Sequence, residues 1–354
     1  MPEKNVRAGR TMTLKEIAER AGVSIATVSY VLNGNAQISD ETRQKVEKII
    51  KETGYRSNIL AKSLRKNKTS LVGVLVEDVT VWHTAYIIDG INKLAEEKGY
   101  HTILSNLRLL SKIESQFEHI SIFKDDINKA LDVLLGMQVD GIIYVGMHDR
   151  DLGDVLKDIS KPVVYCYCYT SNEGSSVRYS NKEPCYRMTK IFLERGHRDF
   201  AVLKGNEQSE PTHLRMQGIE KALSEVGIQL KKENIIEGNW DYHRTREAVR
   251  PLFERPHLPT AVMAMNDDMA IAVRDEVFAH ELRVPEDISI SGFDNADITY
   301  YGSPKIYTVD RPLQEMGYKA MEMLLDKVNG SKQEDMNIVL PCKIIEGTSI
   351  RRVE

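Results

Sequence analysis

The chain contains 354 residues and carries a formal net charge of −4, so it is long enough for more than one domain with large hydrophobic cores. The charge is unevenly divided, because residues 1–68 contain 14 lysines and arginines against 7 acidic residues (net +7), whereas the remainder contains 34 against 45 (net −11). No apolar run of 18 residues occurs and no signal peptide opens the chain, which argues against membrane insertion and secretion and indicates a cytoplasmic protein. The basic N-terminal part is expected to bind a polyanion.

The first predicted elements are two short helices within residues 13–34, which read TLKEIAERAGVSIATVSYVLNG. Thr13 can cap the first helix, and Glu16 three residues later completes a capping box. Gly22 permits the reversal of the backbone that follows, and Ser24 can cap the second helix. The first helix has one apolar face, formed by Leu14, Ile17, Ala18 and Ala21.

The second helix is predicted to have two different sides. Its buried side is Ile25, Val28 and Leu32, and its open side is Ala26, Thr27, Ser29, Tyr30 and Asn33. Two helices that cross at a glycine turn form a helix-turn-helix, whose second helix can enter the major groove of DNA. A third helix is predicted over residues 40–53, capped by Ser39, ended by Gly54 and lined inside by Val46, Ile49 and Ile50. Double-stranded DNA is therefore the expected partner of this head.

After residue 69, short β-rich runs alternate with helical stretches. The predicted strands form two successive series, at 71–76, 100–106, 139–146 and 161–169, and then at 199–206, 235–240, 260–267 and 288–295. Helical stretches such as 88–98, 215–226 and 269–282 lie between them. This alternation predicts an α/β fold with doubly wound parallel sheets. Two series of strands predict two similar lobes.

The four cysteines do not form a metal site or a redox motif in the sequence. Cys166, Cys168, Cys185 and Cys342 contain no C-x-x-C pair and no cluster with histidine at zinc spacing. Cys166 and Cys168 alternate along a predicted strand, so we expect both to face the same side. We predict reduced thiols, no metal and no cofactor.

In open parallel sheets, ligands bind beyond the carboxyl ends of the strands. The candidates at these ends, together with an arginine at the start of a helix, are Asp78, Trp82, His83, Tyr167, Arg215, Trp240, Asn266 and Asp294. Carboxylates, an amide and a guanidinium can hydrogen-bond hydroxyl groups, and an aromatic face can stack on a sugar ring. The sequence therefore indicates a sugar as the small-molecule effector. Asp267 precedes a predicted helix, and we expect it to cap that helix.

Two other classes of protein share parts of this pattern. Dehydrogenases and kinases have doubly wound sheets, but no G-x-G-x-x-G follows a strand and no G-x-x-x-x-G-K-[ST] occurs. Neither a Ser/His/Asp order nor H-E-x-x-H is apparent. A carbohydrate-binding transport protein would need a signal peptide and would lack a DNA-binding head. We therefore predict that the protein is not an enzyme.

The N-terminal motifs carry a family resemblance. Residues 13–34 and the run YRSNILAKSLRKNKTSLVGVLV at 55–76 resemble the LacI/GalR (lactose-repressor) family of bacterial transcription regulators. The resemblance implies a DNA-binding head over 1–57, a hinge helix and linker over 58–68, and a periplasmic-binding-protein-like effector domain over 69–354. It places lobe 1 at about 69–170 and 308–335, and lobe 2 at about 171–307 and 336–354.

The resemblance also implies how the protein binds DNA. A homodimer would occupy a near-palindromic operator, with Leu64 inserted as a wedge into the minor groove. Because the chain ends at Glu354 without a C-terminal heptad segment, we expect a dimer rather than a tetramer. The expected DNA contacts are Thr13, Ser24, Ile25, Ala26, Thr27, Ser29, Tyr30, Asn33, Thr42, Tyr55, Asn58, Ala61, Lys62, Leu64 and Arg65.

For the effector, the resemblance supports contacts from Arg215, Trp240, Asn266 and Asp294. The chain departs from the family where Tyr167 replaces a common acidic residue, where Gly347 replaces a common arginine, and through an insertion of roughly ten residues around 107–130 that we expect to be partly helical. The regulatory logic stays open at this point. We favour a repressor released by a sugar inducer, and the alternative is a regulator tightened on DNA by a corepressor or a protein partner.

Overall fold

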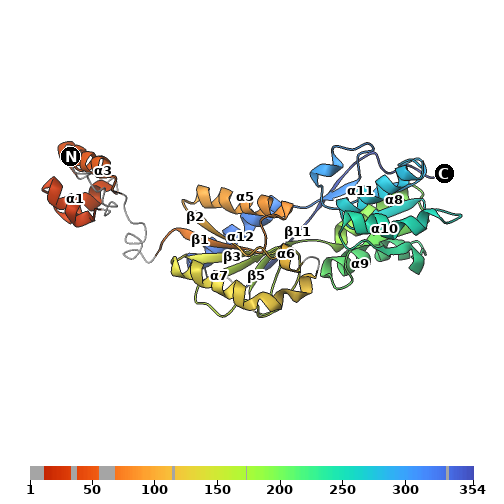
Figure 1. Ribbon diagram of the computed structural model, residues 1–354, viewed down its shortest axis with the longest axis horizontal. Coiled ribbons are helices and arrows are strands. Elements are labelled where there is room, and N and C mark those ends of the chain that lie inside the picture. The colour runs from red at the N-terminus through yellow and green to blue at the C-terminus, as the bar shows by residue number, and fades with distance from the viewer. Residues whose placement is uncertain (1–11, 33–37, 56–67, 114–115, 173, 332–334) are drawn as a thin grey trace, which may run out of the picture. The chain divides into compact units, whose positions relative to one another are not determined.

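The computed structural model describes residues 12–32, 38–55, 68–113, 116–172, 174–331 and 335–354. The chain divides into two compact units, Met1–Thr69 and Ser70–Glu354 (Figure 1). Apart from Lys68, the hinge helix expected over 58–68 lies outside the described residues. Within the described ranges, no helix is long and apolar enough to cross a membrane.

The described part of the first unit contains three helices, α1 (Leu14–Ala21), α2 (Ile25–Leu32) and α3 (Asp40–Thr53). The predicted capping box is present, because the Thr13 N–H donates to Glu16 Oε2 at 2.6 Å and the Glu16 N–H donates to Thr13 Oγ1 at 3.3 Å. Gly22 ends α1 with a φ of 65°, a left-handed conformation that glycine adopts without steric penalty. The helix boundaries thus follow the local signals in the sequence.

The three helices enclose a small apolar core, which consists of Ile17, Ala18, Ala21, Val28, Val31, Val46, Ile49 and Tyr55. The prediction that Ile25 is buried is wrong, because its side chain is 44% exposed, whereas Val31 is 6% exposed. At 100° per residue, Ile25 and Val31 lie about 120° apart around the helix axis. The face that buries Val28 and Val31 therefore turns Ile25 outward.

The first lobe of the second unit is built on a six-stranded sheet with the order β11-β5-β4-β3-β1-β2. All neighbouring strands are parallel. The strands are β1 (Leu71–Val76), β2 (His101–Asn106), β3 (Gly141–Val145), β4 (Val163–Cys166), β5 (Ser175–Tyr179) and β11 (Asn337–Leu340). The helical segments are α5 (Trp82–Glu97), α6 (Leu110–Ile113), η1 (Phe117–Phe123), α7 (Lys124–Gly136) and α12 (Leu313–Val328). The insertion around 107–130 is therefore partly helical, as predicted.

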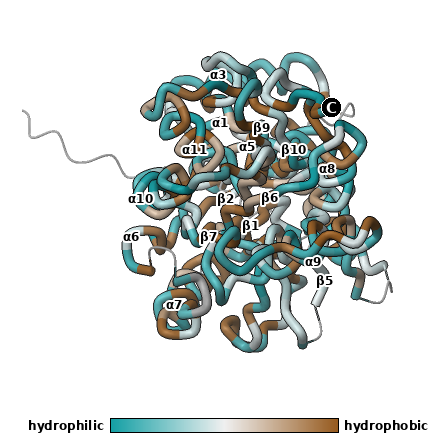
Figure 2. Tube along the Cα trace, turned by 90° about the vertical axis from the view of Figure 1, so that its right-hand side faces the viewer, coloured by the Kyte–Doolittle hydropathy of each residue, from teal (hydrophilic) through white to brown (hydrophobic). Residues whose placement is uncertain are grey.

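Helices cover both faces of this sheet. Helices α5 and α12 pack side by side on one face, and α7 covers the other (Figure 1). The α5–α12 contact requires glycine, because a Cβ on Gly90 would overlap the carbonyl oxygen of Gln314 and a Cβ on Gly317 would overlap that of Ile87. In Figure 2 the strand segments at the centre are largely hydrophobic, whereas the surrounding helices alternate between hydrophobic and hydrophilic stretches.

The second lobe contains a four-stranded parallel sheet with the order β7-β6-β8-β9. Its strands are β6 (Phe200–Lys204), β7 (Ile235–Glu237), β8 (Ala261–Ala264) and β9 (Ser289–Ser291). Its helical segments are α8 (Lys182–Glu194), α9 (Glu210–Ser224), η2 (Lys232–Asn234), α10 (Tyr242–Phe253), α11 (Asp267–Ala279) and η3 (Asp297–Thr299). A separate antiparallel pair joins β10 (Thr308–Asp310) to β12 (Lys343–Ile345), and the C-terminus lies in the second lobe (Figure 1).

The pairing of β5 and β11 corrects the predicted lobe boundaries. Both strands lie in the first sheet, so lobe 1 extends to Tyr179 instead of ending near residue 170. On its return, the chain leaves lobe 1 after Leu340 instead of near residue 335. The segment SSVRY of β5 contains too few apolar residues to be recognised as a strand, and its pairing with β4 and β11 defines it.

The four cysteines are free and buried, but Cys166 and Cys168 do not share a face. Cys166 belongs to the core between the sheet, α5 and α12, whereas Cys168 belongs to the core on the α7 side. Strand β4 ends at Cys166, and Tyr167 has a φ of 60°. Alternation of side chains requires continuous extended backbone, and the left-handed residue interrupts it.

Candidate functional site

Helix α2 presents the open face of the first unit. Ala26 is exposed, Ile25 is 44% exposed and Tyr30 is 48% exposed, whereas Thr27 and Ser29 are half-buried. Ser24 acts as the helix cap, because its Oγ accepts the N–H of Thr27 at 3.0 Å. A short second helix with a small-residue and polar outer face has the shape that enters a major groove.

Other candidate DNA contacts in this unit have structural roles of their own. Thr13 belongs to the capping box, and the Thr42 N–H donates to the cap Ser39 at 3.4 Å. Tyr55 is 8% exposed and packs in the core of the unit, so its ring is not part of the open surface. Six candidates lie outside the described residues: Asn33, Asn58, Ala61, Lys62, Leu64 and Arg65.

A cavity of about 380 Å³ lies where the strand ends of the two lobes meet, which is within the usual size range of ligand pockets. Seven of the eight predicted effector residues line it, namely Trp82, His83, Tyr167, Arg215, Trp240, Asn266 and Asp294. The other lining residues are Thr80, Val81, Leu110, Met147, His148, Asp268 and Arg311. The sequence therefore identified half of the residues that line this cavity, and their contact with an effector stays a prediction.

Asp78 does not line the cavity. Its carboxylate accepts the N–H of Thr80 at 2.9 Å, the hydroxyl of Thr80 at 2.7 Å and the N–H of Leu110 at 3.0 Å. These contacts brace the two loops that follow β1 and β2. Asp78 therefore supports the wall of the cavity instead of facing a ligand.

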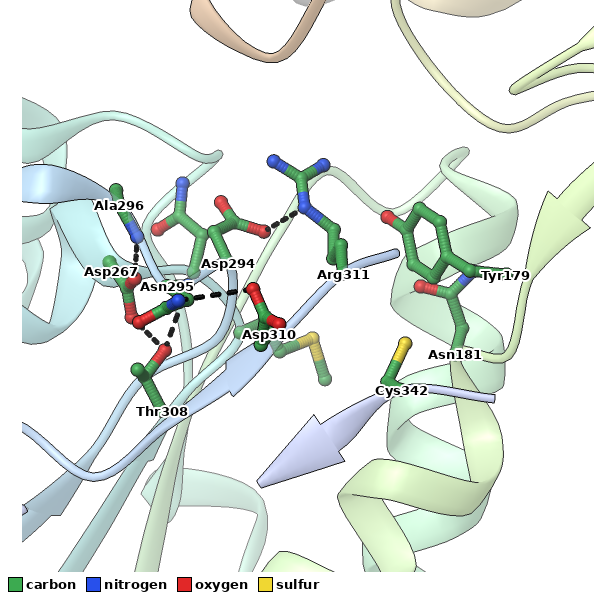
Figure 3. A network of polar contacts seen from close by, with 12 residues as sticks. Tyr179, Asn181, Asp267, Asp294, Asn295, Ala296, Thr308, Asp310, Arg311 and Cys342 are labelled. Carbon is green, nitrogen blue, oxygen red and sulfur yellow. Dashed lines mark hydrogen bonds and ion pairs between the residues drawn. The ribbon is translucent and has the colours of Figure 1, made fainter. Parts of the chain in front are cut away.

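The prediction that Asp267 caps the following helix is wrong. Asn266 is the cap, because its Oδ1 accepts the N–H of Met269 at 2.9 Å, and α11 begins at Asp267 itself. Asp267 accepts the hydroxyl of Thr308 at 2.6 Å and the N–H of Ala296 at 2.8 Å (Figure 3). Asp267 thus ties the loop that carries Asp294 to strand β10.

Arg215 on α9 is a fixed positive charge in the wall of the cavity. Its Nε donates to Asn181 Oδ1 at 2.9 Å, one terminal nitrogen donates to the Tyr179 hydroxyl at 3.1 Å, and the other contacts the Met265 carbonyl oxygen. The guanidinium also lies 3.6 Å from the ring centre of Phe293 and 5.2 Å from that of Trp240. Because its donors are engaged by the protein, Arg215 holds the cavity in shape and supplies charge.

Arg311 was missed by the sequence reasoning. It follows β10, a short strand that was not predicted and that pairs antiparallel with β12, so the strand-end rule for parallel sheets did not point to it. Its Nε lies 3.2 Å from Asp294 Oδ1 (Figure 3). One terminal nitrogen donates to the Tyr167 hydroxyl at 3.3 Å, and the guanidinium lies 4.9 Å from the ring centre of Trp82. The other terminal nitrogen is buried without a hydrogen-bond partner among the described residues, so it can donate to a ligand.

The charges that line the cavity balance. Two arginines, Arg215 and Arg311, face two carboxylates, Asp268 and Asp294. Burial lowers the pKa of His83 and of His148, which was also missed by the sequence reasoning, well below the ordinary value, so both imidazoles are neutral at pH 7. Burial raises the pKa of Asp294, while the charges of Arg311 and Arg215 oppose that rise.

Two further polar atoms are available to a ligand. Nε1 of Trp240 and Nε2 of His83 are buried without a hydrogen-bond partner among the described residues. Trp240 has a φ of 63°, and its ring fills the space in which a Cβ of residue 205 would lie. Gly205 therefore makes room for the indole at the cavity. No group of three or more metal-binding side chains occurs in the part of the chain that the structure describes.

Comparisons with known proteins give two domain matches. The family "Bacterial regulatory proteins, lacI family" matches residues 13–58, and "Periplasmic binding protein-like domain" matches residues 189–350. The HTH-type transcriptional repressor PurR of Vibrio atlanticus (strain LGP32) is 31% identical over 96% of this chain and 98% of its own length.

Solved structures agree in fold. The lac repressor dimer bound to operator and the anti-inducer ONPF has a TM-score of 0.80 at 24% identity, covering 97% of this chain and 100% of that chain. A complex of the transcriptional regulator CelR with cellobiose has a TM-score of 0.64 at 26% identity, covering 96% of this chain and 99% of that chain. Both likenesses extend over a helix-turn-helix head and a two-lobed body.

Proposed function

This chain belongs to the LacI family of bacterial transcription regulators, and we propose that it is a cytoplasmic repressor that binds a near-palindromic operator as a homodimer and is released by a neutral sugar. The observation that carries this proposal is the charge-balanced, aromatic cavity between the lobes, in a chain that also has a helix-turn-helix head. Regulators of this family are not enzymes.

The head supplies the DNA contact. The exposed face of α2, with Ala26 and Tyr30, would lie against base edges in the major groove. The basic balance of residues 1–68 would add contacts to phosphates, which carry most of the affinity and make it depend on salt. A dimer would place two such helices on two half-sites.

The cavity supplies the effector contact. Asp294 and Asp268 can accept hydrogen bonds from hydroxyl groups, while Arg311 and the Trp240 indole can donate to hydroxyl oxygens. Trp82 and Trp240 offer aromatic faces for the apolar side of a pyranose or furanose ring. Since the charges balance, a neutral ligand fits better than a phosphorylated or acidic one. The known complex of CelR with cellobiose supports a sugar.

A sugar can change operator binding only through its differential affinity for two lobe arrangements. Residues from both lobes line the cavity, with Trp82, His83 and Tyr167 from the first and Arg215, Trp240 and Asn266 from the second. A ligand that contacts both sets therefore favours one relative position of the lobes. Coupling of this kind is typically worth about 1–3 kcal/mol, or roughly 5-fold to 150-fold in operator affinity.

The test has two steps. First, the thermal unfolding of the full chain is screened against neutral mono- and disaccharides, and a sugar at about 100 times its Kd should stabilise the protein by about 2.7 kcal/mol. Second, operator fragments selected from random DNA are titrated with the protein, with and without that sugar. We expect the sugar to weaken operator binding at least about fivefold.

The outcomes separate the alternatives. Operator binding that becomes tighter with the sugar would indicate a corepressor. A protein that binds its operator but is stabilised by no sugar would overturn the sugar effector and favour another ligand or a protein partner. Failure to select any sequence from random DNA would contradict the proposal that the protein is a sequence-specific repressor.

A further inference from the structure

A buried ion pair lies beneath the first-lobe wall of the cavity, outside the set of residues that face a ligand. Glu77 follows β1 and is fully buried, and its Oε1 lies 2.7 Å from a terminal nitrogen of Arg150, whose side chain is 8% exposed. A buried ion pair adds little to stability on its own, because the loss of hydration offsets the attraction between the charges. Its geometry is therefore the informative feature.

The side-chain hydrogen bonds of this pair lead to one loop, residues 146–150, which we call the cleft loop, and to the strand that precedes it. The Glu77 carboxylate accepts the N–H of Met147 at 2.9 Å, and it accepts the hydroxyl of Tyr144, in the strand that leads into the loop, at 2.7 Å. Arg150 in turn donates to the carbonyl oxygen of His148 at 3.1 Å. The pair thus fixes both ends of the segment that carries His148.

The cleft loop reaches the second lobe at two points. His148 Nε2 lies 2.8 Å from Oγ of Ser209, the cap of α9, and its ring centre lies 5.8 Å from that of Trp240. Asn181 donates to Asp149 Oδ2 at 3.2 Å and also accepts the Nε of Arg215. Side chains of one loop in lobe 1 therefore reach two of the effector-site residues of lobe 2, Trp240 directly and Arg215 through Asn181.

We infer that Glu77 and Arg150 are positioning residues, which hold the cleft loop so that His148 bridges the lobes and covers Trp240. The role of His148 at an effector site rests on the proposed function, whereas the position of the cleft loop does not. With the pair broken, the backbone of Met147 and His148 loses its two charged anchors, and His148 moves away from Ser209 and Trp240.

The two tryptophans allow a test in the full-length protein without any ligand. Trp82→Phe leaves Trp240 as the single tryptophan reporter, and acrylamide quenching of its fluorescence measures how well it is covered. In this background, Glu77→Gln should raise the quenching constant about twofold or more, because the half-buried indole loses its cover. His148→Ala should raise it to a similar degree.

The decisive measurement is the double variant. If Glu77 acts through His148, then Glu77→Gln combined with His148→Ala should quench no more than His148→Ala alone, because coupled residues are not additive. Additive effects, or an unchanged quenching constant in Glu77→Gln alone, would overturn the inference. If Glu77→Gln fails to fold, the paired change Glu77→Met with Arg150→Met removes both buried charges and should give the same rise.

Glu276 provides a matched control. It is a second buried glutamate, 3% exposed, which pairs with Arg246 at 2.9 Å and with Arg250 at 3.1 Å between α10 and α11. Glu276→Gln should destabilise the protein comparably but leave the quenching of Trp240 unchanged. A rise in quenching in this control as well would show general loosening, and it would overturn the specific role of the Glu77–Arg150 pair.

Discussion

The Asp294 carboxylate and the Arg311 guanidinium meet 3.2 Å apart where the chain crosses between the lobes. Asp294 follows β9 and Arg311 follows β10, and the two strands approach each other through bridges between Ser291 and Tyr307 and between Asp294 and Asp310. Both side chains line the cavity. A ligand that hydrogen-bonds either group therefore acts directly on a crossing point of the chain.

We expect Asp294→Asn to weaken effector binding by about tenfold or more, the usual loss for a hydrogen bond to a charged group, while operator binding is retained. Calorimetry with the sugar found by screening, and anisotropy with operator DNA, measure the two effects separately. The exposed Asp297 does not line this cavity, so Asp297→Asn is the control and should leave effector affinity and operator affinity unchanged. Unaltered effector affinity in Asp294→Asn would contradict the assignment.

Tyr30 should set base preference at one position of each half-site. Its side chain is 48% exposed on α2, and a phenol cannot make the bidentate contact that arginine makes with guanine. We expect wild-type protein to prefer a base other than guanine there or to show little preference, and Tyr30→Arg to shift the preference to guanine. Selection from random DNA measures this, with Tyr30→Phe as the control. A strong preference for guanine in wild type that does not change in the arginine variant would refute the role of Tyr30.

Asp149 should make the stability of the body depend on pH. Burial raises the pKa of Asp149 to about 6, compared with an ordinary value of about 3.9. Between these values the folded protein holds a proton that the unfolded chain has released. The free energy of unfolding should therefore fall as the pH rises from about 4 to about 6, by up to about 1.4 kcal/mol for each unit.

Asp149→Asn should remove this dependence, which is measured from urea midpoints at several pH values. The buried His83 and His148 contribute in the opposite direction, because their lowered pKa makes the protein lose stability as the pH falls below their ordinary value. The difference in the free energy of unfolding between wild type and Asp149→Asn isolates the contribution of the carboxylate. A constant difference across this pH range would argue against a raised pKa at Asp149.

Gly317→Ala should destabilise the first lobe by about 1–3 kcal/mol, the usual penalty for overpacking, since the new methyl group would overlap the carbonyl oxygen of Ile87 in α5. Gly136→Ala at the end of α7 is the control, because its methyl group would meet no atom within 4 Å. That change should be neutral or stabilise by about 0.5–1 kcal/mol, as alanine does in helices. Thermal unfolding compares the two, and equal midpoints would contradict the close packing of α5 and α12.

The structural elements whose signals lie within a few neighbouring residues of the chain were predictable from the sequence. The capping box of Thr13 and Glu16, and the turn at Gly22, need only residues three or four positions apart. The strands β1 and β3 are continuous apolar runs, and their ends could be read directly. The common edge of parallel strands then brought Trp82, Trp240 and Asn266 to one cavity.

Only the tertiary structure decided which segments pair and which polar groups find partners over long distances. The strand β5 is recognisable through its pairing with β4 and β11, and Ile25 is exposed because the face of α2 that the other helices cover takes in Val31 instead. His148 gains its role from Ser209, which lies 61 positions away, and Arg311 gains its role from Asp294, which lies 17 positions away. Glu77 and Arg150 lie 73 positions apart in the sequence and pair with each other. Local propensity acts along the chain, whereas burial and charge pairing act through space, so the sequence determined the class of protein and its head, and the packed fold determined the electrostatics of its cavity.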